Sequence, residues 1–184
     1  MDAGGQQSDD RSDEELVEAV NGGDPSAFDF LYHRHRDWVA NLAFRFVRDR
    51  DLALDVLQET FVYLAGKFPG LTLTAKLRTF LYPAVRNLAL SVKKKSERLQ
   101  TDQEEAIRSV PAQASAAADV EIFAALGGIS DEQREVLLLR FIDGFQLNEI
   151  AGLLEVPVGT VKSRLHNALT TLRKDPRTKK LFGQ

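Results

Sequence analysis

The chain has 184 residues, of which 43% are hydrophobic and 28% charged, a balance typical of a soluble protein with one large or two small domains. The absence of cysteine excludes disulfides, thiolate metal sites and cysteine nucleophiles, and neither a membrane-length apolar run nor a secretory leader is present, so we expect a cytoplasmic protein without membrane insertion. The formal net charge of −3 argues against a nucleic-acid partner, provided that the charges are evenly distributed.

Apolar residues repeat at three- and four-residue spacing through the first half of the chain, which predicts helices. Helix-starting signals precede these repeats: a capping box at Ser12 and Glu15, and Asp24 ahead of a proline at the first helical position. Pro83 lies inside the fourth stripe and should kink that helix or restrict its early turns, because proline removes a backbone donor. The expected helices follow a disordered acidic tail at 1–11, form one domain over 12–95, and carry stripes at 16–20, 28–46, 53–68 and 77–92.

The second half begins with a polar stretch that has the composition of an interdomain linker, rich in glutamine and alanine. Helix signals resume near Asp119, and Gly127-Gly128 closes the first of these helices. Ser130 caps the next helix, which should turn Val136, Leu137, Leu139 and Phe141 inward. We therefore expect an all-α protein of two small domains joined by a flexible linker, with the linker at 96–118, the second domain at 119–176 and a basic tail at 177–184.

The segment from Gln146 to Ala168 has the spacing of a helix-turn-helix, with a three-residue turn at 155–157. An ordinary helical hairpin with a basic solvent face would share this pattern. The apolar residues that should pack the two helices together are Ile150, Leu154, Val156, Val161 and Leu165. The other face of the second helix carries hydrogen-bond donors able to reach base edges and phosphates in a major groove: Thr160, Lys162, Ser163, Arg164, His166 and Asn167.

The charges are in fact segregated along the chain. Residues 2–18 contain seven acids and one base, a sum of −6, whereas 76–98 and 160–180 each contain seven bases and one acid, a sum of +6. Local clusters decide whether a surface can bind a polyanion, so the net charge does not exclude nucleic acid. One basic segment falls in each expected domain.

Two sets of motifs resemble a known family. The second half carries Leu137-Leu138-Leu139-Arg140-Phe141, Glu149-Ile150-Ala151 and the run Val158-Gly159-Thr160-Val161-Lys162-Ser163-Arg164-Leu165, which resemble region 4 of the extracytoplasmic-function (ECF) sigma factors of the sigma-70 family. The first half carries Gly23-Asp24, Ala27-Phe28, Leu31-Tyr32, Asp55-Val56, Gln58-Glu59-Thr60-Phe61, Leu81-Tyr82 and Arg86-Asn87-Leu88-Ala89, which resemble region 2 of that family. Both sets stand in the family's order.

This resemblance implies a bacterial promoter-recognition subunit of RNA polymerase, without enzymatic activity, cofactor, metal or small-molecule substrate. The implied polymerase contacts are the clamp coiled coil of the largest subunit and the flap. The clamp would meet Asp55, Gln58 and Glu59, which share a helix face by their spacing. The implied DNA partners are promoter duplex and single strand, an anti-sigma factor is a further expected partner, and the protein would join the nucleoid when bound to polymerase.

Family members read the minus ten element with a loop and the helix after it. By an ungapped mapping, the loop is 71–76, and the expected mechanism is capture of an unstacked base together with tracking of the exposed strand by basic and aromatic groups. This sequence departs from the family at Phe80, where tryptophan is usual, and at Pro83, where a basic residue is frequent. The implied contacts are Leu71, Thr72, Thr74, Lys76, Arg78, Tyr82, Arg86, Asn87, Lys93 and Lys94.

Two other functions remain open at the level of sequence: a stand-alone helix-turn-helix regulator that binds duplex without polymerase, and a helical protein-interaction module. The order of the two motif sets and the Asp55, Gln58 and Glu59 group favour the sigma factor. A metal site at His33 and His35 is disfavoured, because residues two apart do not share a helix face.

Overall fold

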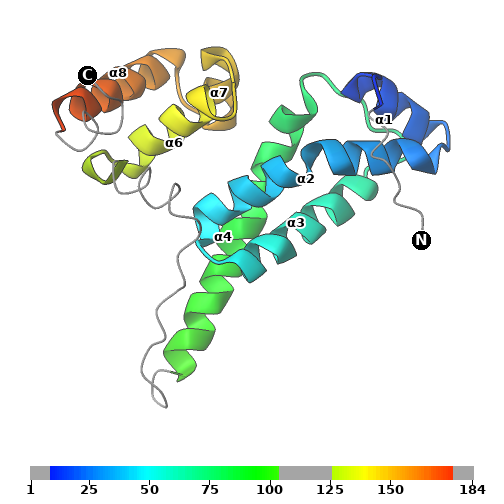
Figure 1. The fold of residues 1–184 in the computed structure, drawn as a ribbon, viewed down its shortest axis with the longest axis horizontal. Helices are drawn as coiled ribbons and strands as arrows, with labels where there is room; N and C mark the ends of the chain where they lie inside the picture. The colour runs from blue at the N-terminus through cyan, green and yellow to red at the C-terminus, as the bar shows by residue number, and fades with distance from the viewer. Residues whose placement is uncertain (1–8, 104–125, 176–184) are drawn as a thin grey trace, which may run out of the picture. The chain divides into compact units, whose positions relative to one another are not determined.

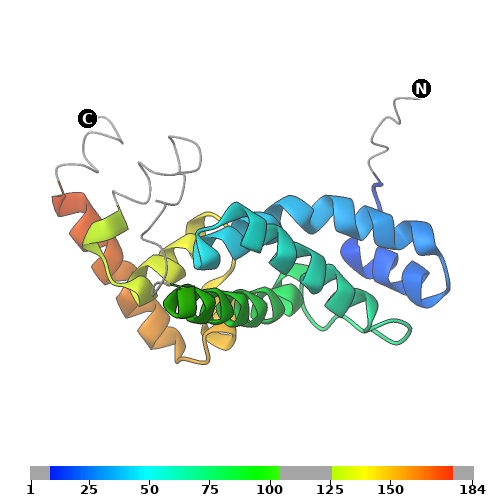
Figure 2. The ribbon, with the colours of Figure 1, turned by 90° about the horizontal axis from the view of Figure 1, so that it is seen from below.

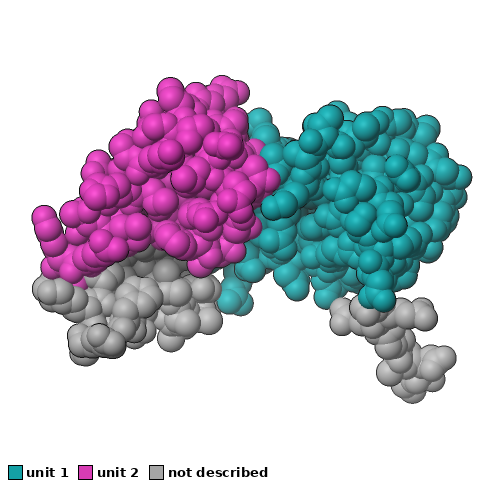
Figure 3. Space-filling model, turned by 90° about the horizontal axis from the view of Figure 1, so that it is seen from above, with its two compact units in different colours: residues 1–112 teal, residues 113–184 magenta. Residues whose placement is uncertain are grey.

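A computed structural model describes residues 9–103 and 126–175, with side chains given for 9–98 and 127–175. The chain divides into two compact units, residues 1–112 and 113–184 (Figure 3). The described residues form seven α-helices and one short 3-10 helix and contain no strand (Figure 1). The predicted all-α class is confirmed.

The first two helices begin where the capping signals predicted. Helix α1 spans Asp13–Asn21, and its capping box joins the Glu15 N–H to Ser12 Oγ at 3.2 Å and the Ser12 N–H to a Glu15 carboxylate oxygen at 2.6 Å. Helix α2 spans Pro25–Val47, with Asp24 accepting a hydrogen bond from the Ser26 N–H at 3.0 Å. These caps satisfy backbone donors that have no partner within a helix.

The next two helices differ from the predicted stripes at their C-terminal ends. Helix α3 spans Arg50–Ala65, capped by Asp49, and ends before the predicted residue 68. Helix α4 spans Leu77–Gln103 and therefore enters the stretch assigned to the linker, of which 104–118 lie outside the described residues. Helix α4 continues through Pro83, so this proline does not end the helix. The Pro83 side chain is exposed.

The core of the first unit lies where α2, α3 and α4 pack on one another, and α1 packs against α2 (Figure 2). Each helix buries one apolar stripe, as amphipathic helices do. Core side chains with less than 2% exposure include Leu16, Leu31, Val39, Leu42, Val56, Leu64, Leu77, Leu81, Tyr82 and Val85. Trp38 is also a core residue, with 8% exposure.

A polar cluster holds α1 against α2. One Asp13 carboxylate oxygen lies 2.9 Å from His35 Nε2, and the other accepts a hydrogen bond from Arg34 at 2.9 Å. His35 is buried at 3% exposure. Burial raises the pKa of Asp13, but hydrogen bonds and charge from His35 and then Arg34 outweigh it, so the pKa lies below its ordinary value.

Stability should therefore depend on the charge of Asp13. A carboxyl group whose pKa is lowered by folding contributes stability above its unfolded pKa of about 3.9, and this contribution is lost as the pH falls through the folded pKa. We expect Asp13→Asn to lower the free energy of unfolding at pH 7 by about 1–2 kcal/mol. Urea unfolding at a series of pH values below 7 measures this, and the difference in free energy of unfolding between wild type and variant should shrink as the pH falls through the folded pKa of Asp13. Equal stability of the two proteins at pH 7 would contradict it.

The second unit contains a 3-10 helix, Leu126–Gly128, and three α-helices. Helix α6 spans Asp131–Phe141 with the predicted Ser130 cap, α7 spans Leu147–Leu153 and α8 spans Val158–Lys174. Their core includes Val136, Leu139, Phe145, Ile150, Val161 and Ala168, all at most 2% exposed. The prediction that Phe141 faces inward is wrong: its side chain is 58% exposed at the end of α6. The helix expected over 119–125 and both terminal tails, apart from residues 9–11, lie outside the described residues.

Candidate nucleic-acid interface

Helices α7 and α8 form the predicted helix-turn-helix. The N–H of Glu155 donates to the Gly152 carbonyl at 3.3 Å and that of Val156 to the Ala151 carbonyl at 3.0 Å, the paired bonds of a Schellman motif. Ala151 is 7% exposed, so its small side chain sits in the packed part of the motif. Of the five residues predicted to join the helices, Ile150 and Val161 are fully buried and Leu154, Val156 and Leu165 are half-buried.

Glu155 adopts a left-handed backbone conformation, with φ of +53°, at the position where a Schellman motif most often has glycine. Side chains with a Cβ are disfavoured there by about 1–2 kcal/mol. We expect Glu155→Gly to raise the free energy of unfolding of the second unit by about 0.5–1 kcal/mol, after the entropy of the more flexible unfolded chain is subtracted. Thermal unfolding measures this, and Thr171→Gly, at an exposed position inside α8, should instead lower stability by a few tenths of a kcal/mol. A loss of stability in Glu155→Gly would contradict the argument.

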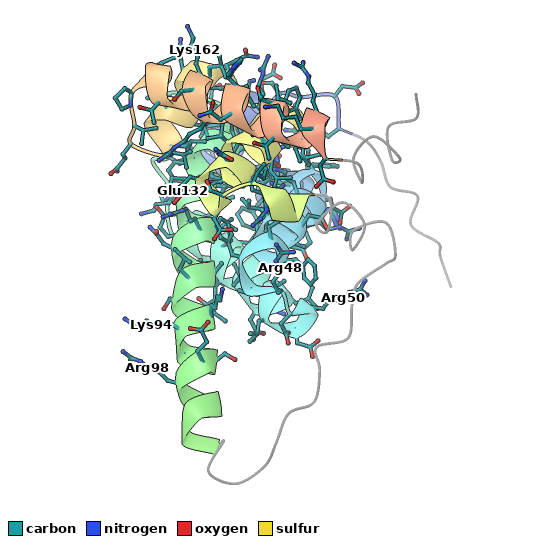
Figure 4. All side chains as sticks on the ribbon, turned by 90° about the vertical axis from the view of Figure 1, so that its left-hand side faces the viewer. Arg48, Arg50, Lys94, Arg98, Glu132 and Lys162 are labelled. Carbon is teal, nitrogen blue, oxygen red and sulfur yellow. The ribbon has the colours of Figure 1, made fainter. Side chains whose placement is uncertain are left out.

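The solvent face of α8 carries most of the residues predicted to touch duplex DNA. Lys162, Ser163, His166 and Asn167 are exposed, and Lys162 projects outward from the helix in Figure 4. The Ser163 hydroxyl donates to the Thr160 carbonyl at 3.0 Å, so it is partly engaged within the helix. Spacings of three and four place these side chains on one face, near the N-terminal half of the helix.

Thr160 and Arg164 are half-buried. The pKa of Glu132 is lowered mainly by the hydrogen bond that its carboxylate accepts from the Ser130 side chain at 2.7 Å, and the positive charge of Arg164 contributes to the lowering.

In the first unit, the structure separates the predicted loop residues into two groups. Thr72, Thr74 and Lys76 are exposed, whereas Leu71 is buried at 8% exposure. Tyr82 is also buried, at 1%. The expectation that Leu71 and Tyr82 meet DNA needs correction, because both side chains fill the core and neither can reach a ligand without unpacking it.

The remaining predicted contacts lie along α4. Asn87, Lys93 and Lys94 are exposed, Arg86 is half-buried, and Lys94 and Arg98 project from the same side of the helix (Figure 4). The half-buried Arg78 guanidinium lies 5.4 Å from the centre of the Trp38 ring, a cation–π arrangement that covers the tryptophan. Phe80, where the family usually has tryptophan, is half-buried and stacks on Tyr63 at 6.1 Å between ring centres.

Helix α3 presents an acidic face. Asp55, Gln58 and Glu59 are all exposed, as a partner contact requires. The same side of the helix also carries Leu54 at 50% and Val62 at 67% exposure. Sequence analysis missed these apolar side chains, although the four-residue spacing Leu54, Gln58, Val62 marks a shared face.

Within the described ranges, no group of three or more histidine, cysteine or acidic side chains is arranged to hold a metal ion. Among the helices of those ranges, none combines the length and the apolar character needed to cross a bilayer.

Comparison with known proteins gives the same division. The family model for sigma-70 region 2 matches residues 31–99, and that for sigma-70 region 4 matches residues 119–172. The RNA polymerase sigma-H factor of Pseudomonas aeruginosa is 30% identical over 181 residues, covering 88% of this chain and 92% of that protein. The ECF RNA polymerase sigma factor SigW of Bacillus subtilis is 28% identical over 177 residues, covering 88% and 95%.

The chain belongs to the ECF sigma factors of the sigma-70 family.

Two solved structures share the fold of this sigma factor at 23% sequence identity. One is CnrH in complex with the cytosolic domain of CnrY, with a TM-score of 0.65 over 89% of this chain and 96% of that one. The other is the sigma factor RpoE of Bartonella quintana in complex with the anti-sigma factor NepR, with a TM-score of 0.61 over 84% and 96%. Sigma factors are regulatory proteins of transcription initiation that bind core RNA polymerase and promoter DNA, and promoter recognition is the function of this chain.

Proposed function

We propose that this sigma factor reads the minus thirty-five element with α8 and the minus ten element with the 72–76 loop and α4, while α3 docks on the polymerase clamp. The observation that carries the proposal is the exposed polar face of α8 after a helix-turn-helix turn, in a chain that also has the region 2 unit. The sigma factor itself forms no phosphodiester bond. The polymerase performs the chemistry, and the sigma factor selects where transcription begins.

In the upstream contact, α8 lies in the major groove of duplex DNA. Lys162 contacts phosphate, and His166 and Asn167 lie on the face that meets base edges. Thr160, Ser163 and Arg164 complete the proposed set. The slightly acidic chain limits DNA binding by the free protein, so that stable contact depends on polymerase.

In the downstream contact, the melted strand crosses the loop tip and continues along α4. Thr72, Thr74 and Lys76 are the exposed loop residues, and the basic side of α4 follows the phosphates of a single strand. The proposed α4 contacts are Arg78, Arg86, Asn87, Lys93 and Lys94. Leu71 and Tyr82 support this surface from inside the core rather than touching DNA.

The polymerase contact uses opposite charge and apolar area together. The acidic residues of α3 suit a basic partner, and the exposed Val62 adds surface that a partner can bury. In the second unit, the exposed Phe141 and Ile142 at the end of α6 are candidates for the flap contact.

An anti-sigma factor is a proposed third partner. Both structural neighbours described above were solved in complexes, one of them explicitly with an anti-sigma factor. Such a partner would cover the α3 face and so compete with polymerase. We also propose that this sigma factor has no enzymatic activity and acts in the cytoplasm, at the nucleoid when polymerase-bound.

Run-off transcription with core polymerase and a candidate promoter tests the proposed function. The full chain should bind core enzyme and start transcripts at one position. Binding to promoter duplex without any affinity for core polymerase would instead support a stand-alone regulator, and binding to neither would support a helical interaction module.

Lys162→Ala should weaken upstream binding by holoenzyme about threefold to tenfold, because one phosphate contact is lost. The salt dependence of this binding should also weaken: the slope of log K against log salt concentration should decrease in magnitude by about one unit. Titration of fluorescent promoter duplex at several salt concentrations measures both. Lys174→Ala is the matched control, since Lys174 is exposed at the other end of α8, about 18 Å away along the axis. An equal effect of the two variants would contradict the assignment.

A further inference from the structure

The side chain of Asn21, the last residue of α1, bridges to the loop that follows α3. Its amide nitrogen donates to the Leu71 carbonyl at 2.8 Å, and its amide oxygen accepts from the Gly70 N–H at 2.6 Å. The two segments are some fifty residues apart in sequence, so this is a tertiary contact. Asn21 thereby satisfies one donor and one acceptor of a loop backbone that has no helix or sheet to do so.

The same loop is fixed at its edges by packing. Upstream, the ring of Phe68 contacts Phe28 edge-on with 6.1 Å between ring centres, and the Leu71 side chain is buried. Downstream, Leu77 is fully buried at the start of α4. Between these anchors, 72–76 form a short segment in which every residue except the half-buried Leu73 is exposed. The loop tip is therefore held at both ends, and most of its side chains are exposed to solvent.

Helix α1, which carries Asn21, is itself anchored to the rest of the unit. Leu16 and Val17 of α1 are buried against the rest of the unit, and the Asp13 cluster with His35 ties α1 to α2. The Asn21 side chain at the end of this anchored helix can fix the position of the loop, because both its hydrogen bonds are directional. Only an amide supplies a donor and an acceptor in this fork: a carboxylate would repel the Leu71 carbonyl.

We propose that Asn21 is a positioning residue for the promoter-reading loop, holding 72–76 in the geometry that captures the melted strand. This inference rests on the proposed role of the loop in reading the minus ten element. It assigns to the N-terminal helix a part in base capture, although α1 itself contributes none of the proposed DNA contacts. Loss of the amide should loosen the loop and weaken single-strand capture, with no direct effect on the α3 or α8 surfaces.

The test compares Asn21→Ala and Asn21→Asp with Asn41→Ala, an exposed asparagine on α2, as the matched control. Each full-length variant is measured for its affinity to core polymerase. Holoenzyme made with each variant is then measured for its affinity to upstream duplex and to a single-stranded minus ten oligonucleotide. Asn21→Ala should lose about tenfold in oligonucleotide affinity while the other two affinities stay within twofold. Asn21→Asp, which keeps the acceptor for Gly70 but repels Leu71, should lose at least as much, and Asn41→Ala should match wild type.

Amide hydrogen exchange supplies a readout that a general loss of stability would not reproduce. In Asn21→Ala the Gly70 amide should exchange faster while core amides of α2 and α3 keep their protection. Equal oligonucleotide affinity of wild type and Asn21→Ala would overturn the proposal, as would a parallel loss of all three affinities with faster exchange throughout the unit.

Direct loop variants separate this inference from the proposed function. If Thr72→Ala and Lys76→Ala weaken oligonucleotide binding but both Asn21 variants do not, the positioning role is wrong and the loop assignment stands. If neither the loop variants nor the Asn21 variants have an effect, the loop assignment is itself wrong.

Discussion

Replacing Tyr82 by alanine is expected to lower the free energy of unfolding of the first unit by about 3–5 kcal/mol, the range for removing a buried aromatic ring. The side chain is 1% exposed, so truncation leaves a cavity among packed helices. Because domains are stable by only about 5–15 kcal/mol, this loss is a large fraction of the total stability. Urea unfolding followed by circular dichroism measures the loss.

Tyr82→Phe is the informative control for this variant. It keeps the ring and most of the buried area, so we expect a loss of no more than about 1–2 kcal/mol, the usual range for removing one hydrogen-bonding group. Promoter binding by holoenzyme should follow stability in both variants. A Tyr82→Ala protein of wild-type stability that fails only in minus ten binding would restore a direct DNA contact for this residue.

Reversing charge on the α3 face is expected to abolish most polymerase binding. In Asp55→Lys combined with Glu59→Lys, two exposed acids become bases, and the proposed basic partner meets like charge. We expect about a hundredfold weaker affinity for core polymerase, corresponding to about 2.8 kcal/mol. Competition against labelled wild-type sigma factor measures it.

The matched control is Asp29→Lys, an exposed acid on α2, which should leave the affinity within twofold. Added salt should weaken the binding of wild type to core polymerase, because salt screens exposed charges. The difference in affinity between wild type and the double variant should therefore become smaller as salt is added. A double variant that binds core polymerase as tightly as wild type would remove the clamp assignment from α3.

The helix starts were predictable because they are local. Ser12, Asp24 and Ser130 offer side-chain acceptors immediately before apolar stripes, and each caps a helix as expected. The helix-turn-helix was predictable for the same reason: its spacing, turn and exposed polar face are all encoded within a short stretch.

Burial and tertiary bridges were not predictable in the same way. Phe141 continues an apolar stripe yet is exposed, because α6 ends there and no neighbour covers it among the described residues. Tyr82 has a polar group and a family precedent for DNA contact, yet lies in the core. The bridge from Asn21 to Gly70 and Leu71 joins segments that no local pattern relates.

Because Leu71 and Leu77 are buried on either side of the promoter-reading loop, promoter preference can diverge between related sigma factors without loss of the fold. The two leucines carry the packing on either side of the loop, while Thr72, Thr74, Ala75 and Lys76 between them are exposed. Exposed substitutions away from special backbone positions usually change stability by less than about 0.5 kcal/mol. Under the proposed role of this loop, a paralogue can acquire a new target sequence by exchanging these side chains alone, with its folding left intact.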